Sequence, residues 1–221
     1  MKYPAQKSNT VATDRQSVAR YISDAANPLV ITPLVFLMVG WQFCATYSEL
    51  FSIVSLALIF YSVIPFGFIY YLKSSGQINN LDIRDKSKRS KPYFFTIGSY
   101  LAGSLLISNF SISWNSDLWI IATCFFINPV IGYIINRRWK VSIHSAATGT
   151  AISVLYVMMH STQYSRNPIA GNVSFLFLLI LLPLVMWSRY QLDVHSVPQV
   201  LGGALIGLLL TYGELTLMMN L

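Results

Sequence analysis

The chain has 221 residues, of which 54% are hydrophobic and only 10% are charged. About a quarter of the residues of an ordinary soluble domain are charged, so this composition excludes a soluble globular protein. The formal net charge of +7 does not indicate a nucleic-acid-binding protein, because the cations lie between apolar segments. They are explained by membrane orientation or by anion binding.

The first 27 residues are polar and lack the apolar core of a signal peptide. Within them, residues 14–27 place apolar side chains at helical spacing, with cations elsewhere on the wheel. This pattern predicts an interfacial helix leading into the first span, and a frayed polar tail is the alternative. We therefore expect two parts, an N-terminal segment of residues 1–27 and a membrane bundle of residues 28–221.

Apolar segments fill the rest of the chain and predict an all-α, polytopic transmembrane helical bundle. Seven spans are expected, near residues 28–47, 51–72, 93–112, 118–135, 141–160, 173–187 and 197–219. The sixth is short and Pro129 interrupts the fourth, so a six-span bundle remains the alternative. Cys44 and Cys124 lie inside apolar stretches and are expected to be buried thiols, with no disulfide or zinc site.

The connections between these segments differ strongly in charge. If all seven segments cross, 14 of the 15 lysine and arginine residues lie on one side, and only Arg166 lies on the other. The cations of residues 84–91 and Arg189 are candidate site residues. Without them, eight lysine and arginine residues still lie on the charged side and one on the other. The positive-inside rule then places this face and the N-terminus in the cytoplasm.

Three polar clusters lie at the ends of predicted spans on this charged face. The first, residues 82–92, is rich in cations, the second contains Ser142 and His144, and the third contains Arg189 and His195. An even number of crossings separates each cluster from the next, so all three can meet at one depth. Arginine and lysine can hold the oxygens of a phosphate while one imidazole attacks phosphorus and another transfers protons. The set therefore predicts phosphoryl transfer without a metal.

The spacing Arg84-x6-Lys91-Pro92, Ser142-x-His144 and Ser188-Arg189-x5-His195 resembles the three-part signature of the type 2 phosphatidic acid phosphatase superfamily. The resemblance covers residues 84 to about 207. It implies a multi-pass lipid phosphatase that uses no cofactor and no metal and acts on a lipid or isoprenoid phosphate. It also implies that His195 is the nucleophile and His144 the general acid. The implied phosphoryl ligands are Arg189, Arg84, Lys91, Ser142 and the backbone amides near Ile143.

The chain departs from the usual family pattern at several positions. The cations of the first element are exchanged, and Lys86 or Arg89 can serve instead if the alignment slips. Gln199 replaces the usual final aspartate; its amide oxygen can still orient His195, but it cannot stabilise an imidazolium as a carboxylate does. Asp193 is a candidate to supply the carboxylate that stabilises the imidazolium. A hydrophobic hairpin also separates the first two elements, which indicates a divergent branch.

Two other functions remain open. A magnesium-dependent membrane prenyltransferase would explain residues 82 and 85, both aspartates, but it needs a second aspartate-rich motif that the sequence lacks. A small transporter or lipid-binding protein would need polar groups at mid-membrane or broken helices in two halves. His160, at the far end of its span, is expected to be an interfacial histidine without a catalytic role.

Overall fold

The computed structural model describes residues 14–81, 83, 86–109, 115–160 and 168–220. These residues form helices and their connections, and no strand occurs among them, which confirms the all-α class. The helices are α1 (Asp14–Ala25), α2 (Pro28–Phe43), α3 (Tyr47–Leu58), α4 (Ile64–Ser74), α5 (Ser90–Ile107), α6 (Asn115–Arg138), α7 (Ile143–His160), α8 (Pro168–Gln191) and α9 (Val197–Met218). A π-helical turn, η1 (Ile59–Val63), joins α3 to α4, and a 3-10 turn, η2 (Lys86–Arg89), precedes α5.

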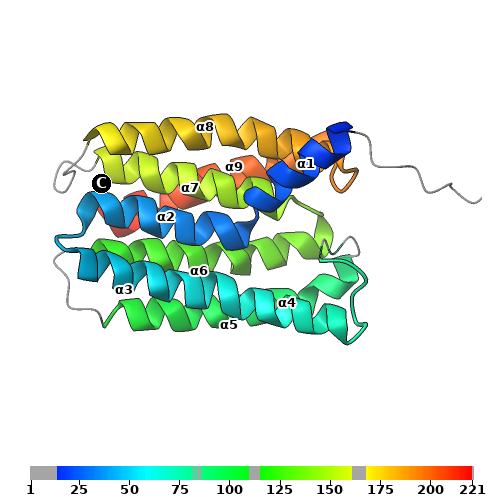
Figure 1. Ribbon diagram of the computed structural model, residues 1–221, viewed down its shortest axis with the longest axis horizontal. Helices are drawn as coiled ribbons and strands as arrows, with labels where there is room; N and C mark the ends of the chain where they lie inside the picture. The colour runs from blue at the N-terminus through cyan, green and yellow to red at the C-terminus, as the bar shows by residue number, and fades with distance from the viewer. Residues whose placement is uncertain (1–13, 82, 84–85, 110–114, 161–167, 221) are drawn as a thin grey trace, which may run out of the picture.

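The long helices run side by side along one axis, and α1 lies at one end of the bundle beside α8 (Figure 1). The connections α4–α5, α6–α7 and α8–α9 all lie at this end, and the C-terminus lies at the other (Figure 1). The three polar clusters belong to these connections. The prediction that they return to one end of the bundle is therefore confirmed for the described residues.

Helix α7 is the inner helix of the bundle. Most of its residues are buried, and it contacts α2, α8 and α9. Its hydroxyl side chains bond to neighbouring helices: Ser153 donates to the carbonyl of Leu208, while Thr150 and Thr211 bond to each other and to Asn128. Polar residues are tolerated in this helix because protein surrounds it.

By length and hydropathy, three helical stretches in the described part could cross a membrane: Tyr47–Ser74, Ser116–Arg138 and Val197–Met218. Helices α1 and α2, which meet at 51°, would make a fourth if they form one broken span. The polar residues of α7 lower its hydropathy although it lies at the centre of the bundle. Several apolar helices are compatible with an integral membrane protein, and the predicted number of seven spans stays a prediction.

Glycines bring α9 into close contact with the first turns of α7. A Cβ atom at Gly203 would overlap the carbonyl oxygen of Ser142, and one at Gly207 would overlap that of Ala146. The backbone N–H of Ser142 donates to the carbonyl of Gln199 at 3.1 Å. This contact joins the starts of the two helices that carry the second and third polar clusters.

Helices α3 and α4 continue through η1 as one stretch over Tyr47–Ser74, and the π-helical turn ends just before Pro65, which cannot donate a backbone hydrogen bond. Side chains of α5 bond to backbone carbonyls of η1: Ser99 donates to Phe60, and Tyr100 donates to Tyr61. Cys124 is buried, as expected from the sequence, whereas Cys44 is only partly buried.

Candidate active site

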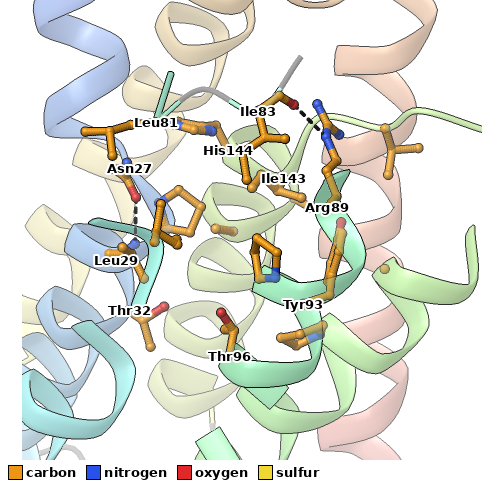
Figure 2. A pocket seen from close by; sticks show the side chains of 18 of the residues that line it. Asn27, Leu29, Thr32, Leu81, Ile83, Arg89, Tyr93, Thr96, Ile143 and His144 are labelled. Carbon is orange, nitrogen blue, oxygen red and sulfur yellow. Dashed lines mark hydrogen bonds between the residues drawn. The ribbon is translucent and has the colours of Figure 1, made fainter. Parts of the chain in front are cut away.

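A cavity of about 570 Å³ opens at the end of the bundle where the three clusters meet. His144, His195, Arg189 and Arg89 all line it. Figure 2 shows part of its wall. Ile143 and His144 come from α7, and Arg89 and Tyr93 lie beside them. Thr32 and Thr96 lie farther along α2 and α5. Residues 106 positions apart in the sequence, Arg89 and His195, thus share one cavity.

The α8–α9 connection folds back on itself and brings Arg189 close to His195. The carbonyl oxygen of Arg189 accepts hydrogen bonds from the backbone N–H groups of Val194 and His195, both at 3.3 Å. Asp193 closes the turn with φ 54°, a left-handed conformation that aspartate tolerates better than most residues. Asp193 is exposed and does not line the cavity, so its role is in the turn.

Gln199 fixes the tautomer of His195. Its Oε1 atom accepts from the backbone N–H of Ser196 and lies 3.2 Å from Nδ1 of His195. The N–H of Ser196 can only donate, so the amide atom facing it is the oxygen. An oxygen acceptor requires a proton on Nδ1 of His195, and Nε2 therefore carries the lone pair.

His195 is only 7% exposed and lies close to several cations. Burial, with the nearby charges of Arg189, Arg89 and Lys140, lowers its pKa to about 3, and only the hydrogen bond to Gln199 opposes this shift. The imidazole is therefore neutral at physiological pH. A neutral ring with a lone pair on Nε2 can act as a nucleophile.

His144 lies in the first turn of α7 and is 5% exposed. Its backbone carbonyl accepts from the hydroxyl of Thr148, one turn along the helix. The N-terminus of α7 adds the positive end of a helix dipole to the site, as the prediction of anion-binding amides near Ile143 requires. Both predicted catalytic histidines thus line one cavity.

Of the cations in the first cluster, the structure brings Arg89 to the cavity. Its Nε atom donates to the carbonyl of Ile83 at 2.7 Å, and its Nη1 atom donates to Oδ1 of Asn136 at 3.2 Å. Lys91, chosen from the sequence spacing, is exposed, does not line the cavity and donates to Oε1 of Gln77 at 2.6 Å. Helix α5 begins at Ser90, between the two cations, and of the two only Arg89 lines the cavity in this structure.

The remaining predicted ligands differ in their positions. Ser142 is fully buried and does not line the cavity; its hydroxyl oxygen lies 3.3 Å from the backbone nitrogen of Ser145 and 3.1 Å from that residue's hydroxyl. It therefore shapes the start of α7 in this structure. Arg84 and the side chain of Lys86 lie outside the described residues.

Several residues near the site carry no recognisable motif in the sequence. Lys140, which looked like a membrane anchor, donates to the carbonyl of Val194 at 2.8 Å and contributes to the lowered pKa of His195. On α1, Ser23 accepts a hydrogen bond from the Arg189 guanidinium. Tyr93 and Asn128 line the cavity, and Tyr93 lies one turn along the chain from Arg89. Only the charge of Lys140 gave any signal in the sequence.

In the described residues, a helical bundle with many exposed apolar side chains, compatible with an integral membrane protein, carries a cavity at one end that histidine and arginine side chains line. The family model of the PAP2 superfamily matches residues 92–221, which is more than half of the chain. The chain belongs to this superfamily, the type 2 phosphatidic acid phosphatases. Membership supports a phosphatase of the phosphoesterase kind. No curated protein and no solved structure matches the chain significantly.

Proposed function

We propose that the protein is an integral membrane lipid phosphatase, which hydrolyses the phosphate ester or diphosphate of a lipid or isoprenoid through a phosphohistidine intermediate. The observation that carries this proposal is the common cavity of His144, His195, Arg189 and Arg89. Two imidazoles and two guanidinium groups provide a nucleophile, a proton donor and charge stabilisation for the phosphoryl oxygens.

The reaction proceeds in two displacements. In the first, the lone pair on Nε2 of His195 attacks phosphorus, and the bond from phosphorus to the ester oxygen breaks. His144, in its imidazolium form, gives its proton to the departing alcohol. In the second, neutral His144 takes a proton from water as the water oxygen attacks phosphorus. The phosphorus–nitrogen bond then breaks, which releases phosphate and restores both rings.

Gln199 replaces the carboxylate that members of the family usually place beside the nucleophile. Once phosphorylated on Nε2, the ring of His195 keeps its proton on Nδ1 and carries a positive charge. The neutral amide of Gln199 accepts that proton's hydrogen bond, and the negative phosphoryl oxygens offset the charge. Gln199 thus orients the nucleophile and leaves its pKa low.

The cavity supports a lipid rather than a fully polar substrate. Beyond the charged residues it continues between α2, α4, α5 and α6, where Leu29, Phe66, Ile69 and Phe125 line it. Apolar side chains there can contact a hydrocarbon chain while the phosphate remains among the cations. We propose seven spans, with α1 at the interface and the cavity mouth at the cytoplasmic surface, as the distribution of cations supports.

The test is a phosphate-release assay on the purified protein in detergent, with and without a chelator. The substrate panel contains phosphatidate (a diacylglycerol phosphate), a phosphatidylglycerophosphate and isoprenyl mono- and diphosphates. The proposal expects release of phosphate that the chelator does not reduce. Activity only with magnesium would favour the prenyltransferase alternative. No release from any lipid phosphate would favour the transporter or lipid-binding alternative.

A further inference from the structure

Helix α1 forms part of the cavity wall although it precedes the family-matched segment. Arg20 and Asp24 of α1, and Asn27 directly after it, line the cavity. Ala19 and Ser23 lie four residues apart, and therefore on one face of the helix, and both are fully buried. Helix α1 packs against α8, the helix that carries Arg189 near its end.

A hydrogen bond joins the two helices inside this contact. Nη1 of Arg189 donates to the hydroxyl oxygen of Ser23 at 2.5 Å. Ser23 is 0% exposed and Arg189 is 4% exposed, so water cannot easily replace either partner. Hydrogen bonds that involve a charged group are stronger than neutral ones, and burial strengthens them further.

The geometry of arginine makes this contact consequential for phosphate binding. A guanidinium is planar and rigid, so a hydrogen bond to one of its N–H groups restricts the orientation of the others. Arg189 also lines the cavity, beside His195. Ser23 therefore restricts the direction in which the remaining N–H groups of Arg189 can meet a phosphoryl group.

We propose that Ser23 is a positioning residue, whose hydroxyl orients Arg189 for binding the phosphoryl oxygens, so that α1 completes the phosphate site. The inference rests on the proposed phosphatase function. It assigns a role in the reaction to a segment 69 residues before the start of the family-matched region, which begins at residue 92.

The test compares Ser23→Ala with Ser17→Ala, which makes the same change at an exposed position of the same helix. Inhibition by inorganic vanadate, a mimic of the phosphoryl transition state, reports the phosphate site directly. Loss of a hydrogen bond to a charged group is expected to weaken vanadate inhibition by about tenfold in Ser23→Ala, with a similar loss of kcat/KM. Ser17→Ala is expected to match the parent. Equal vanadate inhibition in Ser23→Ala and the parent would overturn the inference.

A double-mutant cycle separates positioning from general packing. In an Arg189→Lys background, Ser23→Ala is expected to lose most of its effect on vanadate inhibition. An undiminished effect in that background would show that Ser23 acts without Arg189 and would overturn the inference. A parent that hydrolyses no lipid phosphate would instead defeat the proposed function. A parent that is active and insensitive to Ser23→Ala would defeat this inference alone.

Discussion

The two ends of α7 each carry a histidine, and the two residues differ in burial and in the side chains around them. His144, at the start, is buried in a cavity shared with His195 and two arginines. His160, at the other end, is exposed; its Nδ1 atom lies 2.8 Å from the carbonyl of Tyr156, and its ring packs on that tyrosine's ring. The same side chain thus becomes a candidate catalyst only where several chain segments bring charges and a second imidazole to it.

The largest effect is expected from His195→Ala, which removes the second imidazole of the cavity. His160→Ala, at the far end of α7, is the matched control. Removing the nucleophile should lower kcat by more than about 10³-fold, because no covalent intermediate can form. His160→Ala should leave kcat within about twofold, since among the described residues its hydrogen bond and its ring contact are both with Tyr156 of its own helix. Phosphate release from the best lipid substrate measures both. Activity of His195→Ala close to that of the parent would refute the assignment.

Replacing His144 is expected to give the next largest effect. His144→Ala should lower kcat by about 10²- to 10⁴-fold, the usual contribution of a general acid–base group. The loss should be smaller for a substrate with a more acidic leaving group, such as an aryl phosphate, because that group departs without a proton. The ratio of lipid to aryl phosphate turnover in parent and variant measures this. An equal loss on both substrates would contradict the role of proton donor.

The third comparison tests which cation of the first cluster binds phosphate. Arg89→Ala should lower kcat/KM by about 10²-fold, because it removes a positive charge from the cavity proposed to bind the phosphoryl group. Lys91→Ala should change kcat/KM by less than about threefold, because exposed hydrogen bonds contribute little. The reverse order of effects would restore the assignment drawn from the sequence spacing.

The smallest expected effect is a shift in pH dependence. The lowered pKa of His195, about 3, places its protonation far below neutral pH. The acid limb that His195 contributes to kcat/KM should therefore lie near pH 3, instead of near 6.5. Gln199→Glu keeps the shape of the side chain and adds a carboxylate, which stabilises the imidazolium and raises this pKa. The acid limb should then move to higher pH.

The shift is measured from kcat/KM profiles of parent and Gln199→Glu with one substrate, so that the titration of its phosphate cancels. Coincident acid limbs, or a shift to lower pH, would contradict the proposed contact between Gln199 and His195.

The helical bundle could be anticipated from hydropathy, but helix ends could not. The sixth predicted span, residues 173–187, corresponds to α8, which runs from Pro168 to Gln191. Hydropathy marks only the apolar middle of a helix, whereas backbone hydrogen bonding continues the helix through polar residues at its ends. The extension matters here because it includes Arg189, which lines the cavity.

The motif spacing finds only part of the candidate site, and tertiary contacts alone define other parts of it. His144 and His195 follow from the motif, and Gln199 from its position one helical turn beyond His195. Spacing could not decide between Arg89 and Lys91, because the choice depends on where α5 begins. Ser23 gave no signal, since its meaning comes from a residue 166 positions away in the chain.

Rapid quenching during turnover tests the central claim most directly. A phosphoryl group on a histidine nitrogen is labile in acid and stable in alkali, so a lipid substrate labelled in its phosphate should transfer label to the protein with that stability. Peptide mapping should locate the label on His195, and His144→Ala should still become labelled from an aryl phosphate. Labelling that survives acid, maps to another residue, or persists undiminished in His195→Ala would contradict the account.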